Sequence, residues 1–366
     1  MNDEPHRPKL TRLRSSFIVH RSSFVMTPFL NIDATPVYVG RDLLGRVGSL
    51  VRPRGRVFVI TSHALKERFG EPVAASFDGV DIITIAEGET NKTLDTANDV
   101  VTQLLERGAK RDSMAVVVGG GMIGDTAGFA ASIFLRGIDL VHVPTTLLAQ
   151  VDSSIGGKVA VNHSKGKNLI GSFHPPRAIV TDLAVLDSLS PRERLSGLYE
   201  ALKGGVIADP SLFEIFESGT LDVDEIVRKA IRVKADIVTA DEKEADVRRL
   251  LNYGHTIAHG IEAALHYEGI THGEAVAWGM IAANAIAVDR GLLPRDEAAR
   301  IERTILAYEP SPLPPLSRDE VFAATEHDKK NTGTARVMVF PRRVGECVVC
   351  ADVTEAEVMR GIAAVL

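Results

Sequence analysis

The chain has 366 residues, which is long enough for two domains of ordinary size, each with its own buried core. Hydrophobic residues make up 45% of the sequence, charged residues make up 25%, and the net charge is −6. The composition is that of a globular protein. The mildly acidic balance without a long basic run argues against a nucleic-acid-binding surface, and no run approaches the ~20 apolar residues of a membrane helix.

Residues 1–25 differ in composition from the rest of the chain. They are basic, they repeat the sequence Arg-Ser-Ser-Phe at residues 14–17 and 21–24, and they lead to a second methionine, Met26. A targeting peptide is also rich in Arg and Ser, but two acidic residues near the start and the lack of a long amphipathic stretch argue against one. We expect a disordered tail or a start codon placed too early.

Short apolar runs alternate with helical stretches from Val37 to about Leu186. Residues 57–61, 82–86, 114–118 and 140–143 are predicted to be buried strands, and residues 93–107 have the period of an amphipathic helix. Strands interleaved with helices predict an α/β domain with a doubly wound parallel sheet. We expect this domain to span residues 26–188 and to bind a nucleotide.

A glycine-rich turn follows the predicted strand at 114–118. Residues 119–125 read Gly-Gly-Gly-Met-Ile-Gly-Asp and lead into a helical stretch. Glycines let the backbone approach a pyrophosphate, and the start of a helix supplies unpaired N–H groups. The spacing differs from the usual G-x-G-x-x-G, so the turn is equally consistent with a plain tight turn.

Polar residues are concentrated after the last predicted strand. Thr145 and Thr146 end that strand with two hydroxyls, and Lys158, Lys165 and Lys167 follow among glycines and amides. Lysines combined with close backbone approach favour recognition of a phosphate or a carboxylate. The alternative is a surface loop of solvated lysines.

After Ser190 the pattern becomes mostly helical. Ser-Pro-Arg-Glu at 190–193 is a strong helix start, with a serine cap and a proline at the first position. Helical periods follow at 192–207, 223–240, 273–288 and 294–308, and a capped helix begins after Thr354. Residues 336–340 and 346–351 predict one hairpin. We expect a mostly α-helical domain over residues 189–366, facing the carboxyl ends of the strands, where such sheets bind ligands.

The only cysteines, Cys347 and Cys350, form a C-x-x-C sequence. A redox pair of this kind stands at the start of a helix, whereas these residues fall in a predicted strand. Positions i and i+3 of a strand point to opposite faces, which favours a structural role. With no other cysteine in the chain, we expect a reducing, cytoplasmic compartment.

Potential metal ligands stand apart in the helical half. Glu200 and Lys203 share one helix face, His255 and His259 share another, and His272 begins a further segment. One carboxylate and two imidazoles suit Zn²⁺ with an open fourth position. Spacing alone leaves His259 open as a third histidine ligand, a phosphate contact or a packed core residue.

Two cations, Lys234 and Arg248, are fourteen residues apart, too far for contact on one unbroken helix. Residues 241–244 are expected to break the helix and to let both side chains point into one site beside Asn252. Neighbouring cations are easier to understand if an anion binds between them. The alternative is a salt bridge from Arg248 to Asp241 or Glu244.

Together these motifs resemble the 3-dehydroquinate synthase family. The resemblance runs from about Glu87 to Val276 and more loosely to residues 328–330. Its most specific stretches are residues 119–125, 143–168, 196–203, 234–259 and 272–276. It implies an NAD- and metal-dependent carbon–oxygen lyase of the shikimate pathway, in aromatic amino-acid biosynthesis. The implied reaction converts 3-deoxy-D-arabino-heptulosonate 7-phosphate to 3-dehydroquinate and phosphate by transient oxidation, phosphate elimination, reduction and intramolecular aldol closure.

The resemblance also assigns roles to individual residues. It implies that Zn²⁺ or Co²⁺ binds to Glu200, His255 and His272. It implies NAD contacts from Glu89, Lys92, Gly120, Gly121, Met122, Ile123, Gly124, Asp125, Thr145, Thr146, Asp152, Lys158 and Lys167. For the phosphorylated sugar-acid substrate it implies contacts from Lys158, Asn168, Lys203, Lys234, Arg248, Asn252, His259 and one of Lys329 and Lys330. Arg136 is expected to reach the substrate phosphate of a neighbouring subunit, which implies a homodimer.

Three departures from the family pattern stand near the implied site. Gly204 follows Lys203 where the family usually has tyrosine, and Tyr253 replaces a more usual leucine. Ser62 stands after the first predicted strand, where an acidic residue could have held the adenosine ribose. The alternative functions are a sister sugar-phosphate cyclase, whose substrate lacks the carboxylate, and a metal-dependent polyol dehydrogenase, which would release NADH.

Overall fold

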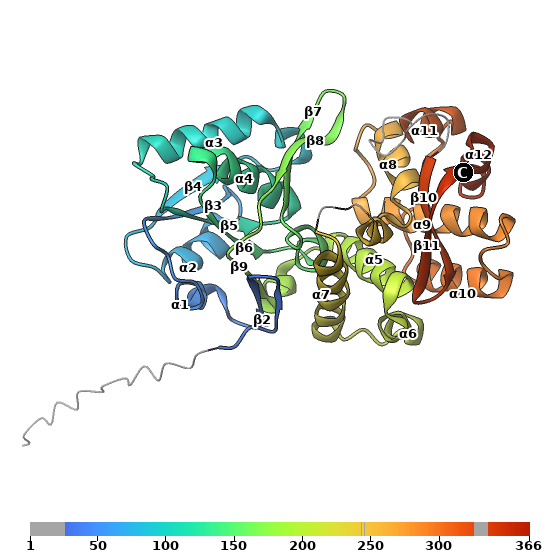
Figure 1. Cartoon of the computed structure of the whole chain (residues 1–366), viewed down its shortest axis with the longest axis horizontal. Helices are drawn as coiled ribbons and strands as arrows, with labels where there is room; N and C mark the ends of the chain where they lie inside the picture. The colour runs from blue at the N-terminus through green and yellow to red at the C-terminus, as the bar shows by residue number, and fades with distance from the viewer. Residues whose placement is uncertain (1–25, 243, 245, 326–335) are drawn as a thin grey trace, which may run out of the picture.

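A seven-stranded sheet forms the N-terminal half of the chain in the computed structural model, which describes residues 26–242, 244, 246–325 and 336–366 (Figure 1). The expected tail at 1–25 lies outside the described residues. In spatial order the strands are β1 (Leu30–Ile32), β2 (Thr35–Gly40), β9 (Ala178–Asp182), β6 (Asp139–Pro144), β5 (Met114–Gly119), β3 (Val57–Ser62) and β4 (Asp81–Ile85). All neighbouring pairs are parallel except β1 with β2. The four predicted strands are confirmed, and β9 is a parallel strand that the sequence pattern did not predict.

Both faces of the sheet are buried, as the doubly wound arrangement requires. Phe58 and Ile60 of β3 pack in one apolar cluster with α3 (Leu94–Glu106) and α4 (Gly121–Ile133), while Val57 and Val59 join a second cluster on the opposite face. The short helices α1 (Val47–Leu50) and α2 (Glu71–Ala74) add Val47 and Val73 to that second cluster. Because successive strand residues point to opposite faces, nearly continuous apolar runs satisfy both clusters.

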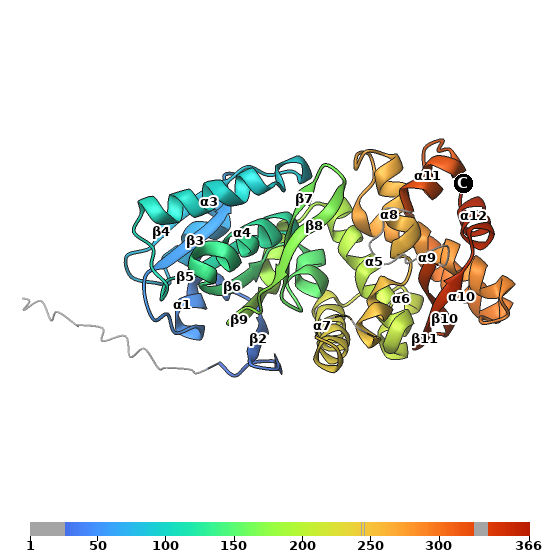
Figure 2. The same cartoon turned by 45° about the horizontal axis from the view of Figure 1, so that its top comes forward.

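A two-stranded hairpin, β7 (Lys158–His163) and β8 (Gly166–Phe173), carries the predicted lysines. The alternative of a surface loop is therefore wrong in its secondary structure. Val159 and Val161 are buried against α4, and a Cβ on Gly128 would lie 2.6 Å from Val159 Cγ1. Figures 1 and 2 both place the hairpin between the sheet and the helical half. The lysines are therefore carried on an ordered strand pair.

The C-terminal half is mostly helical, as predicted. Its helices are α5 (Pro191–Ala208), α6 (Pro210–Ser218), α7 (Val223–Ala240), α8 (His255–Ala264), α9 (His272–Asp289), α10 (Arg295–Leu306), α11 (Arg318–Thr325) and α12 (Glu355–Ala363). The predicted hairpin is β10 (Arg336–Arg343) with β11 (Glu346–Val353). Ser190 Oγ caps α5 by accepting a hydrogen bond from Glu193 N at 3.2 Å, and Thr354 caps α12 in a capping box.

Two glycines of α9 let three helices meet backbone to backbone. A Cβ on Gly273 would lie 2.0 Å from Ser196 O of α5, and a Cβ on Gly279 would lie 2.1 Å from Gly254 O, just before α8. No side chain fits at such distances, so these contacts require glycine. The close approach brings the first turns of α8 and α9 beside the middle of α5.

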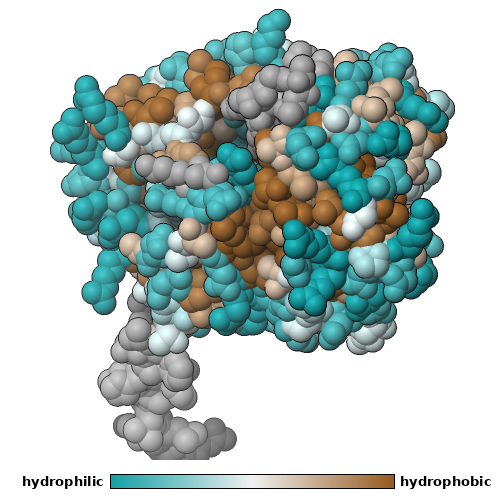
Figure 3. Space-filling model, turned by 45° about the vertical axis from the view of Figure 1, so that its right-hand side comes forward, coloured by the Kyte–Doolittle hydropathy of each residue, from teal (hydrophilic) through white to brown (hydrophobic). Residues whose placement is uncertain are grey.

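Cys347 and Cys350 both lie in β11 as free thiols, in agreement with a structural role. Cys347 is held near the carbonyl of Val206, and burial raises the pKa of its thiol. None of the helices in the described part of the chain is both long and apolar enough to span a membrane. The face in Figure 3 has hydrophilic residues around its edges and apolar side chains gathered across its middle.

Candidate active site

A cavity of about 1340 Å³ lies between the carboxyl ends of the parallel strands and the helical half. Most predicted site residues line it. They are Glu89, Lys92, Gly120, Gly121, Met122, Ile123, Asp125, Thr145, Thr146, Asp152, Lys158, Lys167, Asn168, Lys203, Lys234, Arg248, Asn252, His255, His259 and His272. Residues distant in sequence thus converge on one hollow, at the sheet edge where doubly wound folds bind ligands.

Glu200 is buried and is not itself among the residues that line the cavity, and four further predicted residues are placed elsewhere or are not described. Gly124 lies on the side of α4 that faces His142. Arg136 is exposed and is not among the residues that line the cavity. Lys329 and Lys330 lie outside the described residues. The roles expected of all the predicted site residues, these four included, remain predictions.

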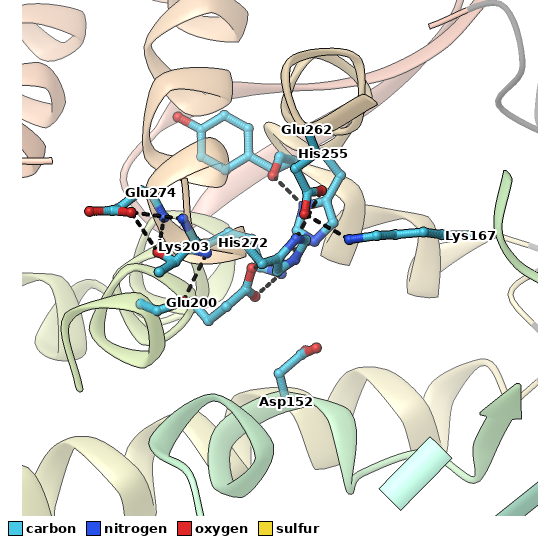
Figure 4. Close-up of polar contacts among 12 residues, drawn as sticks. Asp152, Lys167, Glu200, Lys203, His255, Glu262, His272 and Glu274 are labelled. Atoms are coloured by element: carbon cyan, nitrogen blue, oxygen red, sulfur yellow. Dashed lines mark hydrogen bonds and ion pairs between the residues drawn. The ribbon is translucent and has the colours of Figure 1, made fainter. Parts of the chain in front are cut away.

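Glu200, His255 and His272 converge from α5, α8 and α9 at one end of the cavity (Figure 4). Glu200 Oε1 lies 3.6 Å from both His255 Nε2 and His272 Nε2. This buried oxygen has no hydrogen-bond partner in the described part of the chain. An orphaned carboxylate oxygen facing two imidazole nitrogens fits a divalent metal, because burying it without a partner is costly.

The second nitrogen of each imidazole is held by the protein. His272 Nδ1 lies 3.2 Å from Glu262 Oε2, and His255 Nδ1 lies 3.2 Å from Tyr253 O. These contacts favour a proton on each Nδ1 and leave each Nε2 lone pair facing Glu200. Glu262 is a buried residue of α8 that the sequence reasoning missed; its i, i+3 spacing from His259 was the available signal.

Charge around this cluster is balanced in a network. Lys203 Nζ donates to Glu200 Oε2 at 2.5 Å, and Lys167 Nζ lies 3.1 Å from Glu262 Oε1. Burial and the nearby Lys203 hold the pKa of His255 well below its usual value, so this imidazole is neutral and able to bind metal. Burial alone would raise the pKa of Glu262, but His272 and Lys167 hold it below its usual range.

His259 lies one turn from His255 on α8 and is exposed toward the cavity. Its ring centroid is 5.5 Å from that of His255 and 6.0 Å from that of His272. A packed core role, one of the three alternatives, is therefore wrong. A second possible metal group joins His259, Glu262 and His272. It is more exposed, and its Glu262 carboxylate already contacts His272 and Lys167, so the Glu200 cluster fits a metal better.

The glycine turn lies at the other end of the cavity, between β5 and α4. Gly120 is the N-cap of α4 and has no side chain to cap the helix, so the first N–H groups face the cavity. A Cβ on Gly120 would lie 3.0 Å from Thr146 Cγ2, and one on Gly121 would lie 3.1 Å from Ser153 Oγ. Bare backbone with a helix N-terminus suits a pyrophosphate, which favours the nucleotide interpretation of this turn.

Charged side chains that line the cavity together with this turn are held by contacts with other protein groups. Lys92 is buried and its Nζ lies 2.6 Å from Asp125 Oδ2. Glu89 Oε1 accepts a hydrogen bond from Asn162 Nδ2 at 2.8 Å. Burial raises the pKa of Asp125, although Lys92 opposes that shift.

Lys234 and Arg248 both reach the cavity, and α7 ends at Ala240 as the predicted break requires. Their immediate partners are protein groups. Lys234 Nζ lies 2.5 Å from Asp152 Oδ1, and the Arg248 guanidinium donates to the carbonyls of Gly156, at 2.9 Å, and of Glu242. Asp152 faces the metal-ligand cluster across the cavity (Figure 4). Lys234 and Arg248 therefore share one cavity, as expected, and the carboxylate of Asp152 is the anion beside Lys234.

Glu244 joins two predicted substrate residues and was missed as a site residue. Its carboxylate accepts from Lys158 Nζ at 2.5 Å and from Asn252 Nδ2 at 2.8 Å. Lys158 comes from the β7–β8 hairpin and Asn252 from the short helix η7 (Val247–Asn252), so Glu244 links the two halves of the chain. The sequence placed Glu244 in a helix break and named it as an alternative partner of Arg248, but not of Lys158 or Asn252.

Solved structures with this fold define a class of dinucleotide- and metal-binding enzymes. A 2-deoxy-scyllo-inosose synthase, complexed with carbaglucose-6-phosphate, NAD⁺ and Co²⁺, is 29% identical with a TM-score of 0.83, covering 91% of this chain and 97% of that one. A 2-epi-5-epi-valiolone synthase from Streptomyces hygroscopicus, with NAD⁺ and Zn²⁺, is 28% identical with a TM-score of 0.82, covering 90% and 96%. A glycerol dehydrogenase from Schizosaccharomyces pombe, 15% identical with a TM-score of 0.63 and coverage of 90% and 88%, shares the fold.

Sequence comparison narrows the class to one family. Two family models match the chain. The one described as 3-dehydroquinate synthase N-terminal matches residues 82–196, and the one described as 3-dehydroquinate synthase C-terminal matches residues 197–331. The 3-dehydroquinate synthase of Solibacter usitatus is 39% identical over 340 residues, covering 90% of this chain and 95% of the relative. That of Caulobacter vibrioides is 42% identical over 346 residues, covering 88% and 94%. The chain belongs to the 3-dehydroquinate synthase family.

Proposed function

We propose that this chain converts 3-deoxy-D-arabino-heptulosonate 7-phosphate to 3-dehydroquinate and phosphate, as an NAD- and metal-dependent carbon–oxygen lyase. The observation that carries the proposal is one cavity that joins a Glu-His-His cluster, a bare helix N-terminus and cationic side chains. A phosphorylated sugar acid offers hydroxyls to a metal ion held by the Glu-His-His cluster, and it offers its phosphate and carboxylate to the cationic side chains. Relatives that are 38–42% identical to this chain are named 3-dehydroquinate synthase.

Glu200, His255 and His272 would hold the metal ion, Zn²⁺ or Co²⁺. A divalent ion bound there supplies a Lewis acid that polarises a substrate hydroxyl. Lys203 donates a charge-assisted hydrogen bond to the other oxygen of Glu200 and so fixes the position of this carboxylate. Glu262 and Tyr253 O fix the imidazole orientations, so the ligand atoms are set before any ion arrives.

The NAD site would run from Glu89 and Lys92, past the Gly120–Gly121 turn, to Asp152 and Lys167. NAD⁺ bound there supplies a hydride acceptor that returns the hydride within the same turnover. Thr145 and Thr146 directly follow β6 and line the cavity, with Thr146 beside Gly120. This wall would orient the dinucleotide relative to the metal ligands, as proximity catalysis requires.

Substrate anions would be held by residues from both halves of the chain. Lys234, Arg248 and Asn252 would bind the carboxylate, and Lys158, Asn168 and His259 would complete the contacts. Lys203 and Lys234 are almost fully buried, so each cation acts in surroundings where water screens it weakly. The protein's contribution is therefore mainly positioning and charge stabilisation.

We further propose that the enzyme is a cytoplasmic homodimer, with residues 26–188 as the nucleotide domain and 189–366 as the metal- and substrate-binding domain. Arg136 would reach the substrate phosphate of the neighbouring subunit. In support, Leu135 and Arg136 both have positive φ values, 48° and 69°, and both are exposed beside the exposed Ile133. Such strained, protruding residues are kept where they have a function. One of Lys329 and Lys330 is proposed to contact the substrate.

The test is release of inorganic phosphate from the heptulosonate phosphate by purified enzyme with a trace of NAD⁺ and Zn²⁺. Many turnovers per NAD⁺ without net NADH absorbance are expected, because the hydride is taken and returned. Stoichiometric NADH would support a polyol dehydrogenase instead. Turnover of sedoheptulose 7-phosphate or glucose 6-phosphate in place of the acid would support a sister cyclase.

A further inference from the structure

Strand β3 ends at Ser62, which has no carboxylate to accept hydrogen bonds from a ribose. Ser62 is fully buried, and its hydroxyl donates to Glu87 Oε1 while it accepts from Leu65 N at 3.1 Å. A hydroxyl has one proton to donate, and this proton is used within the protein. In many doubly wound folds an acid near this point accepts hydrogen bonds from the adenosine ribose, and Ser62 supplies no carboxylate.

Glu87 supplies a carboxylate at the same place from the neighbouring strand. It lies two residues beyond β4, which pairs with β3 so that Ile85 stands beside Ser62. Its side chain is exposed and lines the cavity. Asn91 Nδ2 donates to the Glu87 carbonyl at 2.5 Å, which fixes the backbone of this turn.

The surroundings of Glu87 suit the adenosine end of a dinucleotide. Leu65 and Phe69 line the same cavity from the segment after β3 and offer apolar surface to a base. Strand β3 lies between β4 and β5 in the sheet, so Glu87 is two strands away from the Gly120–Gly121 turn. A carboxylate, an apolar wall and a bare helix N-terminus therefore follow one another along the strand ends.

We propose that Glu87 binds the adenosine ribose hydroxyls in place of an acid on β3 and makes the chain select NAD⁺ over NADP⁺. This inference rests on the proposed function, since it assigns one end of the same NAD site. An ionised carboxylate accepts hydrogen bonds from the 2′ and 3′ hydroxyls and repels a 2′-phosphate. The Ser62 hydroxyl and the Asn91 amide hold Glu87 in position for this contact. Arg68 also lines this region, and it is the group that would favour a 2′-phosphate instead.

The test compares Glu87→Gln with Glu67→Gln by calorimetric titration of NAD⁺ and NADP⁺. Glu67 is an exposed residue of the neighbouring helical turn, outside the cavity lining, so its variant controls for the change in charge. We expect wild type to prefer NAD⁺. Glu87→Gln should bind NAD⁺ about tenfold or more weakly and narrow the preference, because a hydrogen bond to a charged group is lost. Glu67→Gln should match wild type.

Equal NAD⁺ affinity in the two variants, or a wild-type preference for NADP⁺, would overturn the role of Glu87. A wild type that binds neither dinucleotide would overturn both this role and the proposed function. The expected NAD⁺ affinities together with no phosphate release from the heptulosonate phosphate would support Glu87 and contradict the proposed reaction. The two failures are therefore distinguishable.

Discussion

Replacing Glu262 by glutamine tests whether the proposed metal site depends on a residue outside its ligand set of Glu200, His255 and His272. Glu262 is buried, and its two oxygens contact His272 Nδ1 at 3.2 Å and Lys167 Nζ at 3.1 Å. Glutamine keeps the shape but removes the charge. The remaining oxygen can still accept from His272 or from Lys167, while the amide N–H₂ faces the other donor and cannot accept from it.

The expected effect is a fall in metal affinity. Partners of metal-binding histidines commonly contribute about 10- to 100-fold in affinity, equivalent to about 1.4–2.7 kcal/mol. Here the upper part of that range is expected, because Glu262 both orients the His272 ring and offsets the charge of Lys167. Lys167 comes from the β7–β8 hairpin, so the loss should also loosen the contact between the hairpin and α8.

Chelator competition with Zn²⁺ on the purified protein measures the affinity directly, without the reaction. Glu268→Gln is the matched control, since Glu268 is exposed just beyond α8. Far-ultraviolet circular dichroism of both variants should match wild type. A Glu262→Gln protein that holds Zn²⁺ as tightly as Glu268→Gln would refute the reasoning from these contacts.

Three further predictions follow from the same geometry. His255→Ala should lose tightly bound metal while His259→Ala keeps it, as measured by metal analysis after dialysis; the reverse result would move the ligand set. Arg248→Ala should lower kcat/KM by about 30- to several-thousand-fold, or about 2–5 kcal/mol, with partial recovery in Arg248→Lys, and a near-normal value would remove Arg248 from the site. Burial and His174 lower the pKa of His142 to about 4, below its unfolded value of about 6.5, so the unfolded chain binds the proton first. The free energy of unfolding should therefore fall by about 2 kcal/mol between pH 7 and pH 5, and urea titrations of His142→Gln should show a flatter dependence.

The sequence alone predicted four adjacent strands of the sheet, β6, β5, β3 and β4, and the main helices. Residues 57–61 and 114–118 are continuous apolar runs, and such runs form strands whose two faces are both buried. Ser190 and Thr354 mark helix starts through local chemistry that needs no distant contact. The hairpin at β7 and β8 was not predicted, because its short Val-Ala-Val run stands among lysines and glycines and is stabilised by packing against α4.

The residue types of the site were also determined by the sequence, through motif spacing and family resemblance. Only the tertiary structure decided how they meet. Glu200, His255 and His272 lie on three helices, and glycine contacts such as Gly273 against Ser196 O bring those helices together. No spacing rule contains that information, because the contact depends on how backbones pack.

Partners that act through another residue were not identified from the sequence, and spacing alone does not show which groups they contact. Glu262 contacts His272 and Lys167, which come from different segments, and Glu87, just after β4, contacts Ser62 at the end of the neighbouring strand β3. The sequence does not show where a carboxylate points. Its role depends on which cations and hydroxyls the fold places within about 3 Å of it. The sequence therefore determined the chemistry available to this protein, and the fold decided which groups share one cavity.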